Sequence, residues 1–333
     1  AEEAAGLPRL AGDEWYAEFE PITAAYRKGA PQTGVHLFHF PTSLCSQVVR
    51  FALAEKGITY ESHVTLIAPP YDHFTPEYAR LNNRLVVPTL ITDGGLTTTS
   101  SSNILAHVDE LFPEAEVKLW PEAEAERDLV AKYIKDLSVL PAEVLTMGQR
   151  REGEDGRASN MRFPRSAVLN KLDVLRRLQE EHESSEPELA RAYEAMLQRK
   201  LQMSDHLEPS AVDAATEEFV RALDSVEAQL ASGPFSGGGW LCSEQLTVAD
   251  CECAVKMHRL AAVGLAERMW AGEGSGRPLV AAYWARVSAR AGFQRGVEAW
   301  ANPLLNIVPH VVGRNSGLVP FYLKQTQRCR SCS

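Results

Sequence analysis

Long hydrophobic runs, cysteine and excess positive charge are all scarce in this sequence. No apolar run approaches the roughly 20 residues needed to cross a bilayer, although 45% of the 333 side chains are hydrophobic. Lysine and arginine number 34 against 44 aspartates and glutamates, a formal net charge of −10, which argues against nucleic acid as a partner. We therefore expect a soluble protein with enough apolar residues for two packed domains.

The six cysteines lack regular spacing, which argues against a disulfide framework and favours a reducing compartment. No signal or transit segment is recognisable, but the sequence begins at Ala1 rather than with methionine. We expect the cytoplasm, or an organelle reached after removal of a targeting peptide. Cys329 and Cys332 form C-x-x-C without a βαβ context or a second ligand pair, so no metal site is expected.

Residues 37–53, LFHFPTSLCSQVVRFAL, predict a short aromatic strand, a tight connection and an apolar helix. Ser43 and Cys45 then lie at the helix N-terminus, where unpaired N–H groups and the helix dipole favour a thiolate. We expect the reaction to occur here. The alternative is that Cys45 is a small buried hydrophobic residue on the inner face of the helix.

The next sixty residues add strand and turn signals. Residues 58–66 predict a second strand, and Pro88 marks a strand entrance where a cis peptide bond is expected to be tolerated. Gly94 and Gly95 predict a hairpin turn. The serine run at 100–102 precedes an apolar helical pattern, a position where serines ordinarily cap the helix.

Four short motifs in fixed order carry a resemblance to a known family. They are T-S-L-C-S at 42–46, F-x-P-E-Y-x-R-L-N at 74–82, V-V-P-T-L at 86–90 and S-x-N-I at 101–104. The chain resembles the glutathione transferase superfamily, in the branch of the tetrachlorohydroquinone and dichlorohydroquinone reductive dehalogenases and ganglioside-induced differentiation-associated protein 1. The resemblance implies an α+β thioredoxin-like N-terminal domain followed by an all-α C-terminal domain with a helical insertion.

The second half of the chain agrees with this resemblance. Residues 166–209 carry leucines and charges at helical spacing, which predicts a hairpin of helices with a solvated outer face, and the relatives named above have an insertion of this kind. Thr247 and Asp250 form an S/T-x-x-D capping box before an apolar helix. The expected parts are an arm at 1–33, a thioredoxin-like domain at 34–115, a helical domain at 116–305 and a basic tail at 306–333.

The resemblance also implies glutathione as the cofactor and roles for several residues in binding it. The hydroxyl of Ser43 would hold the glutathione thiol and raise its thiolate fraction, because a donor near a sulfur anion lowers its pKa. The backbone of Val87 would pair with the cysteinyl part of glutathione. Pro88 would fix the loop that makes this contact.

The carboxylates of glutathione need partners as well. Ser101, with Ser100, would receive the γ-glutamyl carboxylate at a helix N-terminus, and His73 could reach the glycyl carboxylate. At Val86 and Ser100 the chain departs from the family pattern, in which glutamine and an acidic residue are common. These departures bear on the affinity for glutathione.

Cys45 separates the activities that the resemblance implies. In the dehalogenase-like enzymes a cysteine here attacks the sulfur of a glutathionyl-hydroquinone, and a second glutathione resolves the mixed disulfide. We therefore expect a glutathione-dependent transferase or reductase acting on a quinone-like or halogenated aromatic electrophile, with Arg259 steadying a phenolate. Two alternatives stay open: a non-catalytic binding or assembly subunit, and a glutathione-dependent cis-trans isomerase in which Cys45 is dispensable.

Both termini lie outside the resemblance. In the arm, Trp15, Phe19, Ile22 and Tyr26 fall on one face of an expected helix, which should dock on the body of the protein or on a partner. The tail from 302 contains basic but no acidic residues, so contact with an anionic membrane surface or a protein is a further expectation. A homodimer is expected from the resemblance alone.

Overall fold

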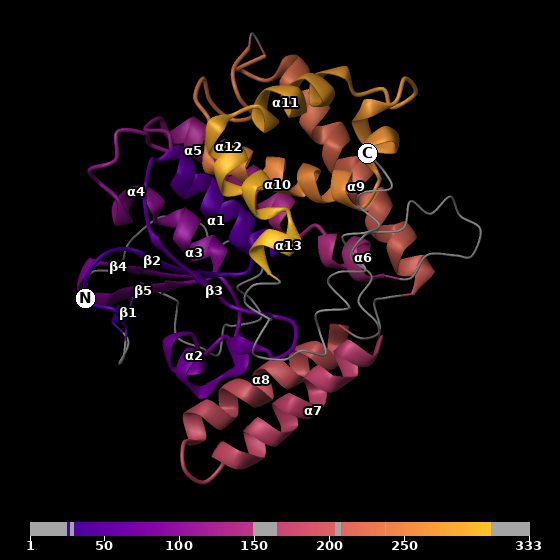
Figure 1. Ribbon diagram of the computed structural model, residues 1–333. Coiled ribbons are helices and arrows are strands. Elements are labelled where there is room, and N and C mark those ends of the chain that lie inside the picture. The colour runs from indigo at the N-terminus through magenta and orange to yellow at the C-terminus, as the bar shows by residue number, and fades with distance from the viewer. Residues whose placement is uncertain (1–24, 27–29, 149–164, 204–207, 237, 308–333) are drawn as a thin grey trace.

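The computed structural model describes residues 25–26, 30–148, 165–203, 208–236 and 238–307 (Figure 1). The calls on Trp15, Phe19, Ile22 and the basic tail beyond residue 307, including Cys329 and Cys332, lie outside these residues. Within the described segments, no helix is long and apolar enough to cross a membrane.

The first half of the chain forms a five-stranded sheet in the order β1-β5-β4-β2-β3. Only β2 and β3 are parallel, and the remaining neighbours are antiparallel. The turn Asp93–Gly95 joins β4 to β5, with Gly94 and Gly95 at positive φ, so the hairpin predicted there is confirmed. The strands are β1 (Ala25–Tyr26), β2 (His36–His39), β3 (Glu61–Val64), β4 (Thr89–Thr92) and β5 (Leu96–Thr99).

Helices pack beside the sheet, and the described part of the second half is built from helices of varied length (Figure 1). Those of the first half are α1 (Leu44–Glu55), α2 (Pro76–Leu81), α3 (Ser101–Ala106) and α4 (Val108–Leu111). Those of the second half are α5 (Glu124–Ser138), α6 (Ala142–Met147), α7 (Arg165–His182), α8 (Pro187–Met203), α9 (Pro209–Ser232), α10 (Val248–Ala262), α11 (Pro278–Ser288), α12 (Ala291–Gly296) and α13 (Pro303–Asn306). The thioredoxin-like half followed by an all-helical half is the fold class that the sequence predicts.

One hydrophobic core joins the two halves. Helix α1 buries Val48, Phe51 and Leu53 in the same cluster as Val255 of α10 and Phe293 of α12. The rings of Phe51 and Phe293 meet edge to face at 5.4 Å between centroids. Because α1 carries the candidate site at its N-terminus, the helical half fixes the position of that site.

The predicted capping box begins α10. The Asp250 carboxylate accepts hydrogen bonds from the backbone N–H of Thr247 at 2.8 Å and of Leu241 at 3.0 Å. It also accepts from the hydroxyl of Tyr283 at 3.0 Å. Asp250 is fully buried, so this side chain ties the start of α10 to the preceding loop and to α11.

The predicted helical hairpin at 166–209 is present as α7 and α8, and it docks on the thioredoxin-like half. In Figure 1 this pair lies beside α2. A second core cluster forms there, which includes Phe74 and Leu85 together with Leu175 and Tyr193. The Tyr193 hydroxyl donates to the backbone carbonyl of Phe74 at 2.8 Å.

The arm differs from its expected structure at Tyr26. This residue was expected on the apolar face of a helix, but Ala25 and Tyr26 form the edge strand β1, antiparallel to β5. The partner of this strand lies seventy residues away in the sequence, so helical spacing of apolar residues in the arm could not reveal it.

Candidate functional site

A capped helix start places the first two candidate residues. Ser43 is the N-cap of α1, and its hydroxyl oxygen accepts from the N–H of Ser46 at 3.4 Å. The hydroxyl hydrogen of Ser43 stays available to a further acceptor, because a hydroxyl both donates and accepts. Cys45 follows in the first turn, as expected, but its side chain is exposed. The alternative of a buried structural cysteine at this position is therefore wrong.

A buried arginine that the sequence did not single out holds the connection between β2 and α1. Arg50 donates to the carbonyl of Pro41 at 2.7 Å, of Phe40 at 3.3 Å and, across to the helical half, of Gly296 at 2.8 Å. Its guanidinium also lies 5.2 Å from the ring centroid of Trp300. Burial lowers the pKa of Arg50 to about 9. Arg50 thus holds the turn that precedes Ser43 in place through hydrogen bonds to its backbone carbonyls.

Cys45 contacts Ser101, the first residue of α3, through a side-chain hydrogen bond. Burial raises the pKa of the Cys45 thiol above its ordinary value of 9.0, while this hydrogen bond lowers it. The net direction is opposite to the more acidic thiol expected from the helix N-terminus, and burial is its largest cause. The thiol is exposed on one side, so solvent moderates this effect.

Arg259 comes from α10 and lies near the same thiol. Its guanidinium donates to Thr146 Oγ1 of α6 at 3.0 Å and to the carbonyl of Thr42, beside Ser43. Burial lowers the pKa of Arg259 to about 10, and the nearby Glu143 and Cys45 oppose that shift. Ser43, Cys45, Ser101 and Arg259 together are called the Cys45 site below.

The other expected glutathione contacts lie in two loops. Ser100 caps α3 with a φ of 68°, and its hydroxyl oxygen accepts from the N–H of Asn103 at 3.3 Å. The Val87–Pro88 peptide bond is cis, and Val87 is buried. The Tyr78 hydroxyl donates to the carbonyl of Val86 at 2.6 Å, which fixes the loop just before this bond.

His73 lies in a different environment from the Cys45 site. It is buried, with Nδ1 at 3.1 Å from the carbonyl oxygen of Leu66 and its ring stacked on Phe74 at 3.8 Å. Burial, together with Lys171 and Lys200, holds the pKa of His73 well below its ordinary value. The side chain is therefore neutral near pH 7 and offers no positive charge to a glycyl carboxylate.

Sequence reasoning missed a set of charged residues around the Cys45 thiol. Glu252 and Lys256 of α10 form an ion pair at 3.4 Å, and both act on the pKa of Cys45, as does Glu143 of α6. The pKa of Glu143 is lowered, because the positive charges of Arg199 and Lys200 of α8 and of Lys171 of α7 outweigh its desolvation. The charged cluster below means Glu143, Lys171, Lys200, Glu252 and Lys256. No local motif marks these residues, since they come from four separate helices.

Comparisons with known proteins place both halves in one family. Residues 37–116 match the family profile described as "Glutathione S-transferase, N-terminal domain", and residues 209–286 match "Glutathione S-transferase, C-terminal domain". Ganglioside-induced differentiation-associated protein 1-like 1 of Homo sapiens is 28% identical over 294 residues, which is 84% of this chain and 77% of that protein.

A bacterial enzyme and a solved structure extend the comparison. Tetrachloro-p-hydroquinone reductive dehalogenase of Sphingobium chlorophenolicum is 27% identical over 261 residues, 78% of this chain and 94% of that enzyme. The structure of Ure2p in complex with S-hexylglutathione aligns with a TM-score of 0.54 at 18% identity, over 80% of this chain and 99% of that one. Both profiles match in order on a thioredoxin-like half and an all-helical half, and the chain belongs to the glutathione transferase superfamily.

Proposed function

We propose that the protein is a glutathione-dependent reductase or transferase that acts on a quinone-like or halogenated aromatic electrophile. The observation that carries the proposal is the exposed Cys45 thiol in the first turn of α1, hydrogen-bonded to Ser101. It lies two residues after Ser43, whose hydroxyl hydrogen is free to donate to a glutathione sulfur. An accessible thiol beside a bound glutathione sulfur is the arrangement that thiol-disulfide exchange requires.

The reductive step uses Cys45 as the nucleophile. Its thiolate attacks the sulfur of a glutathionyl-hydroquinone, so that a Cys45–glutathione disulfide forms and the sulfur–ring carbon bond breaks. The ring carbon keeps the electron pair and takes a proton, which reduces the ring and oxidises the two sulfurs. A second glutathione thiolate then attacks the mixed disulfide, which releases oxidised glutathione and restores the Cys45 thiolate.

Charge around the thiol favours an anionic aromatic ring. The buried Arg259 lies close enough to Cys45 to interact with it electrostatically, and Lys256 lowers the pKa of the same thiol. A hydroquinone that leaves as a phenolate gains from both positive charges. The glutamates of the charged cluster oppose this effect, so we assign the phenolate contact to Arg259 rather than to the cluster as a whole.

Glutathione would be held by the residues that surround this thiol. Ser43 would donate to its sulfur, the backbone of Val87 would pair with its cysteinyl part beside Pro88, and Ser100 with Ser101 would meet the γ-glutamyl carboxylate. The Ser101 hydroxyl has one hydrogen, which it cannot give to Cys45 and to a carboxylate at the same time. We therefore propose that glutathione binding changes the hydrogen bond that Cys45 receives.

The test is the intact mass of the protein after mixing with a glutathionyl-hydroquinone. We expect one glutathione adduct in the wild type, no adduct in Cys45→Ser, and loss of the adduct on addition of excess glutathione. Cys253→Ala is the matched control, because the Cys253 thiol is buried on α10 and this variant should form the adduct normally. Unchanged turnover to the hydroquinone in Cys45→Ser would refute the two-step mechanism.

The same experiment separates the two alternatives. The isomerase would be indicated by three results together. Calorimetry would show glutathione binding, mass spectrometry would show no adduct, and a maleyl substrate would undergo cis-trans isomerisation at the same rate in the wild type and in Cys45→Ser. Absence of both the adduct and glutathione binding would indicate a non-catalytic binding subunit, which the departures at Val86 and Ser100 favour.

A further inference from the structure

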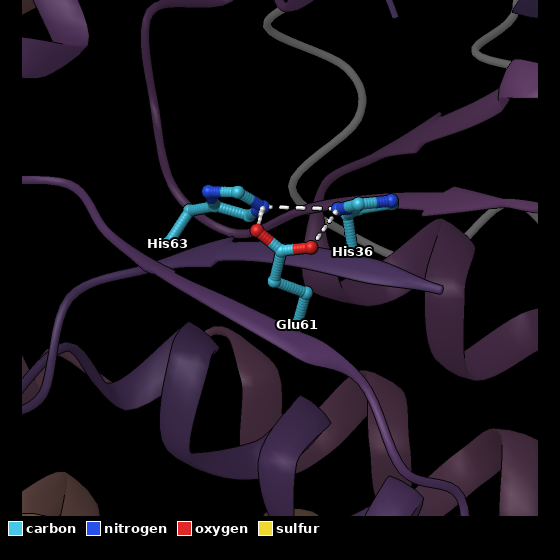
Figure 2. Close-up of side chains that lie close together, drawn as sticks. All are labelled: His36, Glu61 and His63. Carbon is cyan, nitrogen blue, oxygen red and sulfur yellow. Dashed lines mark hydrogen bonds and ion pairs between the residues drawn. The ribbon is translucent and has the colours of Figure 1, made fainter. Parts of the chain in front are cut away.

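Three side chains of types that bind metals converge on one face of the parallel pair β2 and β3 (Figure 2). The register places His36 opposite Glu61, and Phe38 opposite His63. Side chains two apart in a strand share a face, so His36, Glu61 and His63 all point to the same side. We propose that these three residues bind a divalent transition-metal ion, with Zn²⁺ as the expected metal.

The spacing of the donor atoms fits a tetrahedral ion. His36 Nδ1 lies 3.0 Å from His63 Nε2, and the Glu61 carboxylate oxygens lie 3.5 Å from the first and 3.6 Å from the second of these nitrogens. Zinc bonds of about 2.0 to 2.1 Å in a tetrahedron place neighbouring ligand atoms about 3.3 Å apart. The three distances between these donor atoms lie close to that length, so only small side-chain rotations are needed to admit the ion.

The hydrogen bonds of His36 prepare its Nδ1 atom for a metal. His36 Nε2 lies 2.8 Å from the carbonyl oxygen of Thr33, and since a carbonyl only accepts, Nε2 carries the proton. Nδ1 then lies toward His63 and Glu61, where its lone pair can face a metal. A metal-binding histidine commonly donates its second ring N–H to a backbone carbonyl, which fixes both tautomer and orientation.

His63 is oriented by stacking. Its ring lies on that of Phe38, with 4.4 Å between centroids and 12° between planes. In the metal-free tautomer in which His36 Nδ1 accepts, His63 Nε2 carries the proton of the hydrogen bond between them. Metal binding requires the other tautomer, which a neutral imidazole adopts by moving that proton to Nδ1. The ligand set is then two imidazoles and one carboxylate, a combination that suits zinc and leaves a fourth position for water.

The position of this site gives it a different role from that of Cys45. His36 begins β2, whereas Ser43 and Cys45 follow the end of the same strand. β3 is the edge strand of the sheet, and Glu61 and His63 belong to it. A bound ion would tie this edge strand to β2 and to the Thr33 loop, and thus stabilise the sheet. The inference does not depend on the proposed function.

Calorimetric titration of the protein with Zn²⁺ tests the site. We expect one ion per chain and an affinity that His63→Ala lowers at least tenfold. Glu61→Gln should also weaken binding, and because Glu61 is largely exposed (66% for its side chain), this variant keeps the fold. His107→Ala is the matched control, since His107 pairs with Glu110 at 2.8 Å and is not one of the three proposed ligands, and it should bind as the wild type does.

Loading the site with Co²⁺ in place of Zn²⁺ identifies the type of ligand atoms by spectroscopy. Bound Co²⁺ should show the visible spectrum of a tetrahedral nitrogen and oxygen site without a thiolate charge-transfer band, and Zn²⁺ should raise the melting temperature of the wild type but not of His63→Ala. Equal affinity in the wild type, His63→Ala and Glu61→Gln, or a thiolate band with Co²⁺, would overturn the proposal. The cysteines would then be the ligands, and His36 and His63 only a hydrogen-bonded pair.

Discussion

The buried carboxylate of Asp250 offers the sharpest test of how the helical half is held together. In Asp250→Ala, the N–H groups of Leu241 and Thr247 and the hydroxyls of Thr247 and Tyr283 lose the carboxylate as their acceptor. Each buried donor left without a partner costs about 1 to 3 kcal/mol. Allowing for some rescue by water, we expect the free energy of unfolding to fall by about 3 to 5 kcal/mol.

The assay is urea unfolding followed by circular dichroism, with two comparison variants. Asp250→Asn keeps one acceptor oxygen but turns an N–H₂ group toward the remaining donors, so its loss should be intermediate. Asp136→Ala is the exposed control: Asp136 pairs with Lys132 at 3.0 Å on the surface of α5, and such a pair contributes about 0.5 kcal/mol or less.

The result that would refute this reasoning is a loss for Asp250→Ala no larger than that for Asp136→Ala. It would mean that water or a shifted side chain satisfies all four donors. A fall in the slope of free energy against urea, rather than in the midpoint, would instead show that the variant no longer unfolds in one step.

Three further predictions follow from the contacts of the site and the inserted hairpin. Because the pKa of Cys45 is raised above 9.0, the rate of its alkylation by iodoacetamide should still increase with pH above that value. Ser101→Ala removes the hydrogen bond that lowers this pKa and should slow alkylation at neutral pH. A faster reaction in this variant would contradict the contact. Arg50→Met removes the donor to the Pro41 and Gly296 carbonyls, while the Phe40 carbonyl keeps the N–H of Ser43. It should lower the free energy of unfolding by about 2 to 4 kcal/mol, with Arg50→Lys intermediate in urea unfolding. Tyr193→Phe removes one buried hydrogen bond and should cost about 0.5 to 1.5 kcal/mol, and no change in the melting curve would show that the Phe74 carbonyl finds another donor.

Much of the fold could be predicted because its signals are local. The capping box at Thr247 and Asp250, the turn at Gly94 and Gly95, and the helical hairpin at 166–209 each depend on residues within a few turns of one another. Family resemblance then supplied the order of the elements. The short strand at Tyr26 escaped because its partner in β5 is distant in sequence, and two residues carry too little pattern to reveal a strand.

Register explains why the His36, Glu61 and His63 group was not foreseen. Alternation along a strand predicts that His36 and Phe38 share a face, and likewise Glu61 and His63. It does not predict which residue of β2 lies opposite which residue of β3, and a shift of one position would turn one pair to the other face of the sheet. The group exists only in the observed register, which long-range packing sets.

The environment of Cys45 was hidden for a related reason. The sequence placed the thiol at a helix N-terminus, and from that position alone the pKa should fall. The pKa is raised instead, with burial as the largest cause, Glu252 raising it further and Lys256 lowering it. Local position therefore predicts where the thiol lies, while its acidity depends on tertiary structure.

The inserted hairpin, α7 and α8, contributes positive charge near Glu143 as well as apolar surface for packing. Lys171 of α7 and Lys200 of α8 act on Glu143, which in turn acts on Cys45. Burial and the nearby Lys200 lower the pKa of Lys171 to about 7, so its charge changes within the neutral range. The hairpin docks on α2 through Tyr193 and its neighbours. Its position therefore sets how much positive charge Glu143 meets, and a sequence segment that looks like a solvated surface insertion takes part in the electrostatics around the thiol.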